Sequence, residues 1–86
     1  MTDVLHQAEQ HRFVIPAGME EAVLDYHLFK MPDGQAAVDF THTWVPPSHR
    51  GQGLAERLVR EGLRWAKDEG LTIRASCWYA AKFLRN

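Results

Sequence analysis

The chain has 86 residues, of which 45% are apolar and 24% are charged, and its formal net charge is −1 at pH 7. This length allows one domain, and the composition is typical of a folded protein. The balanced charge excludes a nucleic-acid binder that works through bulk positive charge. The single cysteine, Cys77, cannot form an internal disulfide, and no apolar run approaches the roughly 20 residues of a membrane span. We therefore expect one cytoplasmic domain over residues 1–86, without nucleic-acid or membrane partners.

The first half of the chain predicts an antiparallel meander of three strands. Residues 1–10 are polar, and we expect them to fray at the start of the chain. Strands are predicted over residues 11–15, 21–30 and 36–45, because these runs are rich in β-branched, aromatic and aliphatic residues. The runs that separate them contain Pro and Gly, which suit the backbone angles of tight turns.

The third predicted strand alternates regularly between two faces. On this pattern His42 shares a face with Phe40 and Trp44, among apolar neighbours. Asp39 lies on the opposite face, where we expect it to meet solvent, as we do Asp25 of the second strand.

The second half of the chain changes from a period of 2 to a period of 3.6, which predicts a helix over about residues 54–69. A final strand over residues 71–75 and a short helix over residues 79–84 follow. Because a helix crosses between the last two strands, we expect them to be parallel and joined in a right-handed βαβ unit. The predicted fold is α+β, an antiparallel β-meander followed by a βαβ crossover and a short C-terminal helix, built on a mixed sheet.

A basic, glycine-spaced loop joins the third strand to the predicted helix. The N–H groups of a first helical turn have no intrahelical acceptors, and the helix dipole adds partial positive charge there. Glycine lets the backbone approach phosphate oxygens, and the guanidinium of Arg50 can hold two oxygens at once. The loop therefore predicts a site for an anionic ligand, although two glycines at a strand–helix connection also suit a purely structural turn.

The run Arg50-Gly51-Gln52-Gly53-Leu54-Ala55 resembles the acetyl-CoA pyrophosphate signature of the GNAT acetyltransferases. That signature is Arg or Gln, two residues, Gly, one residue, and Gly or Ala. The flanking runs His42-Thr43, Val45-Pro46-Pro47 and Cys77-Trp78-Tyr79 resemble those of the small, single-domain, YjdJ-like branch of that superfamily. The resemblance covers nearly the whole chain, and it is most specific over residues 40–84.

This resemblance implies that the protein binds acetyl-CoA or CoA and transfers an acetyl group to an amine. It implies a mixed sheet whose third and fourth strands splay apart beyond Val45 and Ala75, so that the backbone up to Val45 can bind the pantetheine arm. It also implies which groups hold the pyrophosphate: the Arg50 side chain and the backbone N–H groups of Gly51, Gln52, Gly53, Leu54 and Ala55.

Three side chains are candidates for catalysis, because acyl transfer from a thioester to an amine needs a proton acceptor and a proton donor. Tyr79 would protonate the leaving thiolate, or would simply pack a helix on the sheet. His42 would act as a base near neutral pH, or would be a hydrogen-bonded structural histidine. Cys77 would form an acyl-enzyme or lie beside the sulfur of the coenzyme, or would be an inert thiol.

The chain departs from the family pattern in two places. An acidic residue is common where this chain has Trp44, and a His-Pro-Glu-type tail is common after the position of Asn86. We expect an acetyl-CoA-dependent N-acetyltransferase that works by direct attack of an amine, as a monomer or weak homodimer. A CoA-binding module without catalysis, or a protein-interaction domain on the same fold, are the alternatives. The sequence does not define the acceptor amine, and the spacing of its five histidines and one cysteine predicts no metal site.

Overall fold

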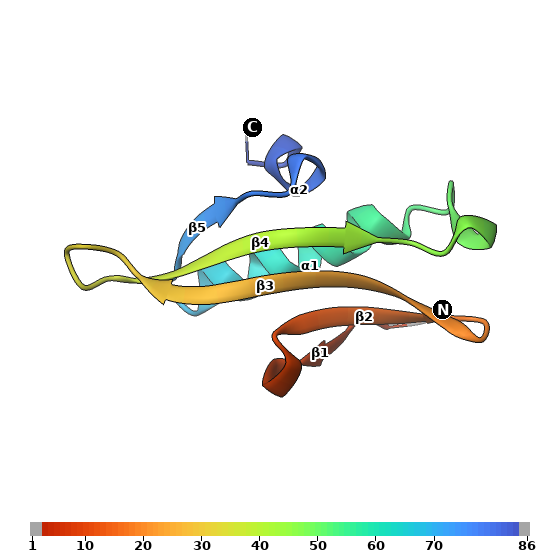
Figure 1. Ribbon diagram of the computed structural model, residues 1–86, viewed down its shortest axis with the longest axis horizontal. Helices are drawn as coiled ribbons and strands as arrows, with labels where there is room; N and C mark the ends of the chain where they lie inside the picture. Colours follow the sequence, from red (N-terminus) through yellow and green to blue (C-terminus); the bar gives the residue numbers. More distant parts are fainter. Residues whose placement is uncertain (1–2, 85–86) are drawn as a thin grey trace.

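The computed structural model describes residues 3–84, and its five strands form one sheet in which strand order follows chain order (Figure 1). No helix within residues 3–84 is long and apolar enough to cross a membrane. The elements are β1 (Leu5–Gln7), η1 (Ala8–Gln10), β2 (Arg12–Ala17), β3 (Glu20–Lys30), β4 (Ala36–Trp44), η2 (Pro47–His49), α1 (Leu54–Asp68), β5 (Thr72–Ala75) and α2 (Trp78–Lys82).

The pairing of the strands confirms the predicted topology. β2, β3 and β4 form an antiparallel meander, and β5 pairs parallel to β4 after the crossover through α1. The predicted strands and the long helix end within two residues of those observed. The C-terminal helix starts one residue earlier than predicted and ends two residues earlier.

The first ten residues contain a strand that the sequence did not predict, and the start of the chain, which we expect to fray, lies outside the described residues. β1 pairs antiparallel with β2, from Leu5 opposite Val14 to Gln7 opposite Arg12. Its one aromatic side chain is anchored on the sheet. The ring of His6 stacks on Phe13 with centroids 4.1 Å apart, and its Nε2 lies 2.7 Å from the hydroxyl oxygen of Tyr26.

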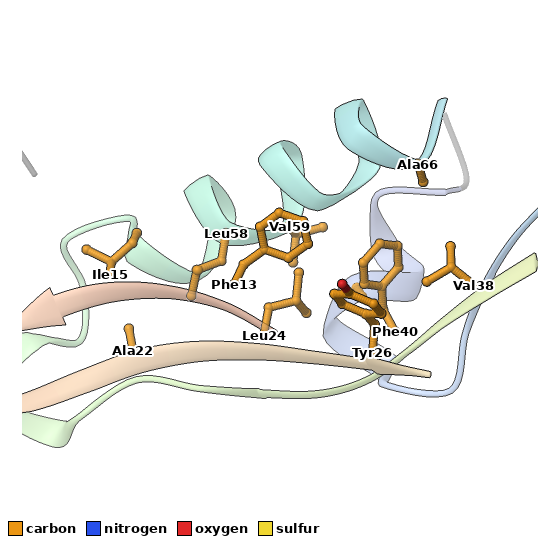
Figure 2. Close-up of a cluster of buried hydrophobic side chains, with 11 residues drawn as sticks. Phe13, Ile15, Ala22, Leu24, Tyr26, Val38, Phe40, Leu58, Val59 and Ala66 are labelled. Atoms are coloured by element: carbon orange, nitrogen blue, oxygen red, sulfur yellow. The ribbon is translucent and has the colours of Figure 1, made fainter. Parts of the chain in front are cut away.

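The core lies between α1 and one face of the sheet (Figure 2). Phe13, Leu24, Phe40 and Leu58 are buried there, and each such side chain contributes roughly 1.5–3 kcal/mol through removal from water. Ala80 of α2 belongs to the same cluster, so both helices pack on the same face. This packing fixes the direction of α1 and holds its N-terminus beside the end of β4.

A β-bulge interrupts β4 at Thr41, and it overturns the predicted alternation of this strand. Asp25 pairs with His42 and Tyr26 pairs with Phe40, so Thr41 is an extra residue without a partner position in β3. Because Leu24 pairs with Thr43, the side chain of Thr43 joins the face that carries Phe40.

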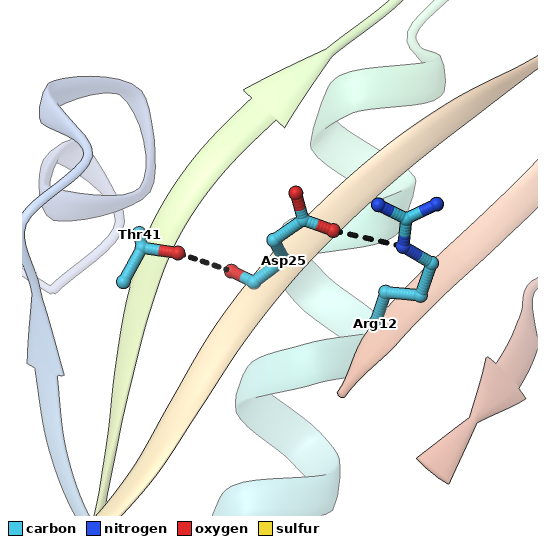
Figure 3. A network of polar contacts seen from close by, with 3 residues as sticks. All are labelled: Arg12, Asp25 and Thr41. Carbon is cyan, nitrogen blue, oxygen red and sulfur yellow. Dashed lines mark hydrogen bonds and ion pairs between the residues drawn. The ribbon is translucent and has the colours of Figure 1, made fainter. Parts of the chain in front are cut away.

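His42 and Trp44 therefore lie on the face opposite Phe40, contrary to expectation. Figure 3 shows how the bulge is held: the Thr41 hydroxyl donates to the Asp25 carbonyl over 3.4 Å, and Arg12 Nε donates to the Asp25 carboxylate over 3.0 Å. Asp25 is thus engaged in an ion pair rather than simply facing solvent.

Candidate functional site

The site begins where β4 and β5 separate. Their register runs from Ala37 opposite Thr72 to Phe40 opposite Ala75, and one further hydrogen bond of 3.0 Å joins the Cys77 N–H to the Phe40 carbonyl. β4 continues to Trp44 while the other chain turns away into α2. The strands therefore part at the bulge, earlier than the predicted separation beyond Val45, because the extra residue ends the match between the two strands.

The separation leaves a cleft of about 460 Å³. Four short segments line it: residues 43–45 at the end of β4, 49–51 in the loop, 53–55 at the start of α1, and 77–79 at the start of α2. The cleft thus brings together the glycine loop and the Cys-Trp-Tyr run, which the sequence separates by more than 20 positions.

The loop that leads into α1 has a backbone that only glycine adopts easily. Gly51 has φ of 84° and Gly53, the N-cap of α1, has φ of 78°. Nothing lies within 4 Å of a Cβ at either position, so the conformation, not lack of space, requires glycine. No side chain within residues 3–84 caps the helix. Its first N–H groups are therefore available to an anion.

Arg50 closes the loop over the end of β4. Its Nε donates to the Val45 carbonyl over 2.9 Å, and Arg50 is among the residues that line the cleft. The guanidinium is exposed, so its other N–H groups can donate to water or to an oxygen-rich ligand. The positive charge of Arg50 and the uncapped N-terminus of α1 would together stabilise an anion bound beside them in the cleft.

Cys77 also lines the cleft and is half-buried. Burial alone would raise the pKa of its thiol, but contacts to the Thr43 side chain and to the backbone of Ala80, Tyr79 and Thr43 outweigh it, so this pKa lies below its ordinary value. The Thr43 hydroxyl oxygen is 3.5 Å from Sγ. The bulge makes this contact, because it turns Thr43 to the face of Phe40.

Tyr79 follows in the first turn of α2, where its ring packs against Phe83 with centroids 5.4 Å apart. Burial, and then the negative charge of Glu56, raise the pKa of Tyr79. The phenol therefore keeps its proton at neutral pH. Both of the predicted roles, proton donor and packing residue, are compatible with this position.

The structure does not bring every predicted residue to the cleft. His42 is exposed and lies outside the lining, because the bulge directs it to the other face of the sheet. Gln52 lines a separate hollow with Ile15 and Arg57. The eight others line the cleft: Val45, Arg50, Gly51, Gly53, Leu54, Ala55, Cys77 and Tyr79.

Four residues that line the cleft were not predicted as site residues: Thr43, Trp44, His49 and Trp78. Trp78 is 73% exposed, which is unusual for tryptophan and places its ring at the rim. Its position directly after Cys77 was the available signal. No group of three His, Cys, Asp or Glu side chains in the described chain is arranged to hold a metal ion.

The fold and the cleft together define a class of protein, one with a splayed parallel strand pair and a glycine loop at a helix N-terminus. The chain belongs to the GCN5-related N-acetyl-transferase family, whose pattern matches residues 12–86. This confirms the superfamily that the loop signature indicated. Membership of the YjdJ-like branch stays a prediction.

Similar proteins agree with this assignment. Protein NATD1 of Bos taurus is 32% identical over 84 residues, which cover 95% of this chain and 71% of that protein. N-acetyltransferase 8B of Rattus norvegicus is 44% identical over 41 residues, 48% of this chain and 18% of that protein.

A solved structure shares the fold. The integron cassette protein HFX_CASS3, from the mobile metagenome of Cole Harbour Salt Marsh, superposes with a TM-score of 0.66 at 20% identity. The match covers 83% of this chain, and the chain spans about half the length of that protein, 48%.

Proposed function

We propose that the protein is an acetyl-CoA-dependent N-acetyltransferase in which an amine attacks the thioester directly. The observation that supports this most is the cleft where β4 and β5 part, which Arg50 and the start of α1 line together with Cys77 and Tyr79. Bound acetyl-CoA would supply an activated acetyl group. Its pyrophosphate would lie on Arg50 and on the first N–H groups of α1, and the β4 backbone up to Val45 would hold the pantetheine arm.

The chain's own residues would then move the protons. Tyr79, whose raised pKa keeps it protonated, would give a proton to the leaving thiolate. The product amide forms as the carbon–sulfur bond breaks, and the amine's proton leaves to water or to a base. His42 does not line the cleft and lies on the face of β4 opposite Phe40, so its predicted catalytic role has no support from its position. Cys77 would lie beside the coenzyme sulfur.

A second candidate is a CoA-binding module without catalysis. No carboxylate is among the residues that line the cleft, and Trp44 stands where the family commonly has an acidic residue. A general base is worth typically a factor of about 10²–10⁴ in rate, so its absence would leave binding intact and transfer slow. Acetylation of any amine in a panel of peptides and polyamines, above the uncatalysed rate, would contradict this alternative.

Isothermal titration with CoA and with acetyl-CoA tests the binding step on which both candidates depend. We expect micromolar affinity in the parent chain and loss of binding in an Arg50→Ala, Gly53→Asp double variant. A matched control is Arg74→Ala with Gly34→Asp, because Gly34 also has positive φ, 92°, and neither residue lines the cleft. No binding by a folded parent at millimolar ligand would end the proposal, and equal loss in the control would assign the effect to stability.

A further inference from the structure

A carboxylate outside the cleft joins the two strands at the point where they part. Asp39 precedes Phe40 in β4, and it accepts two hydrogen bonds from Ser76, the first residue after β5. The Ser76 N–H lies 2.7 Å from Oδ1, and the Ser76 hydroxyl oxygen lies 2.6 Å from Oδ2. Both carboxylate oxygens are used, and bonds to an ionised acceptor are the strong kind.

These two bonds lie directly beside those that place Cys77. The residue after Ser76 donates its N–H to the Phe40 carbonyl, and its thiol meets Thr43 three residues further along β4. The regular pairing of β4 with β5 ends at Phe40 opposite Ala75, the residue before Ser76. The two hydrogen bonds from Ser76 to Asp39 therefore fix the residue directly before Cys77 to β4.

We propose that Asp39 is a positioning residue, which fastens Ser76 to β4 and thereby sets both where the strands splay and where the Cys77 thiol lies in the cleft. The role in acetyl transfer rests on the proposed function, but the placement of the thiol does not. Asp39 neither lines the cleft nor touches the glycine loop. It acts through the backbone of residues 76 and 77.

The lone cysteine makes this role measurable without any cofactor. Every alkylation event reports on Cys77, so the rate of reaction with iodoacetamide across pH 5–10 gives both the pKa and the accessibility of this one thiol. If Asp39→Ala releases Ser76, the thiol loses its contacts to the side chain and backbone of Thr43, which help to lower its pKa, and the pKa rises. We expect a rise of about half a unit or more.

Charge alone predicts the opposite sign. Removing a nearby negative charge favours the thiolate and lowers the pKa of the thiol. Asp39→Asn loses the same charge as Asp39→Ala but keeps an oxygen that can accept one bond from Ser76, so we expect it to raise the pKa less. His27 of β3 and Arg74 of β5 are the titratable or charged residues opposite Asp39 in the register, and they are unchanged in all variants.

The control is Asp25→Ala. This substitution also removes a carboxylate from the same face of the sheet, together with its ion pair to Arg12. Asp25 lies on β3, however, and does not bond Ser76. We expect its thiol pKa to stay within ~0.2 units of the parent value. Ser76→Ala, which loses only the hydroxyl bond, should shift the pKa in the same direction as Asp39→Ala and by less.

Parent-like thiol kinetics in Asp39→Ala and Ser76→Ala would overturn the proposal. So would a fall in the pKa, or an equal rise in Asp25→Ala. If circular dichroism shows that Asp39→Ala is unfolded, Asp39→Asn and Ser76→Ala decide the question. Because the assay contains no CoA, a parent chain that fails to bind CoA would end the proposed function and leave this result standing.

Discussion

At the scale of single residues, Gly62 shows how tightly α1 is packed on the sheet. It lies in the middle of the helix, where glycine costs about 1 kcal/mol relative to alanine. A Cβ there would lie 2.9 Å from Leu24 Cδ2 and 2.9 Å from Phe40 Cε1, closer than such atoms approach in proteins. Glycine is thus required by close approach of the helix, not by backbone conformation.

Gly62→Ala tests this reading. Helix propensity alone predicts stabilisation by up to ~1 kcal/mol, whereas overpacking costs about 1–3 kcal/mol. Because Leu24 and Phe40 are fully buried and cannot move aside easily, we expect the free energy of unfolding in urea to fall by about 1 kcal/mol. A Leu24→Val background, which shortens one opposing side chain, should reduce the loss. A more stable Gly62→Ala variant would contradict the close packing.

Some residues of the site could be predicted from the sequence and others could not. The glycines and Arg50 form a contiguous run whose chemistry is local, so the run itself indicates an anion site. The contacts of Cys77 with Thr43, and of Ser76 with Asp39, join positions 34 and 37 residues apart. They depend on how the strands are registered, which no local pattern specifies.

At the scale of elements, the bulge in β4 decides what faces the cleft. The sequence alternates regularly through residues 36–45, so it predicts two uninterrupted faces. The extra residue at Thr41 exchanges these faces for the rest of the strand, which brings Thr43 to the thiol and takes His42 away from the helices. A bulge leaves the alternation of residue types unchanged, which is why it could not be read from the pattern.

Deletion of Thr41 should therefore alter the cleft while keeping every residue that lines it. A strand without the extra residue can keep Asp25 opposite His42 and Leu24 opposite Thr43, so both side chains keep their faces, but it loses the interruption at which β4 and β5 part, and we expect the cleft to narrow. We expect the deletion to weaken CoA binding at least tenfold, about 1.4 kcal/mol, in the titration described above. Thr41→Val is the control, because it keeps the residue and loses only the 3.4 Å bond to Asp25. Unchanged affinity in a folded deletion variant would show that the bulge is dispensable.

At the scale of the whole molecule, the short β1 links the pH dependence of stability to one histidine. His6 stacks on Phe13, meets the edge of Trp65 with centroids 4.9 Å apart, and lies within hydrogen-bond distance of Tyr26. Partial burial lowers its pKa below the ordinary 6.5, against the smaller opposing effects of Glu61 in α1 and of Glu69 directly after it. The three residues of β1 gave no strand signal, because their anchor is a contact with residues far along the chain.

The sign of the pH effect follows from this shift. The unfolded chain binds a proton at His6 more readily than the folded one. This group therefore contributes stability that is fully present above pH 6.5 and is lost as the pH falls from 6.5 through the lower pKa of the folded state. A protonated imidazole would also no longer accept a bond from the Tyr26 hydroxyl. We expect the parent to lose more thermal stability than His6→Gln between pH 7.5 and about 5.5. Equal losses of melting temperature in the parent and in His6→Gln across that range would contradict this prediction. His27→Gln, which changes an exposed histidine, is the control and should behave like the parent.

The order of the strands bears on how the chain reaches its final form during synthesis. Strand order equals chain order, so β2, β3 and β4 each leave the ribosome next to a partner strand that is already made, and the meander grows through short connections. The parallel pair is different, because β5 follows α1 in the chain and can pair with β4 only after the whole of α1 has been synthesised. The cleft lies at this last junction, between β4 and the segment that follows β5. The part of the molecule that we expect to bind the coenzyme is therefore completed last.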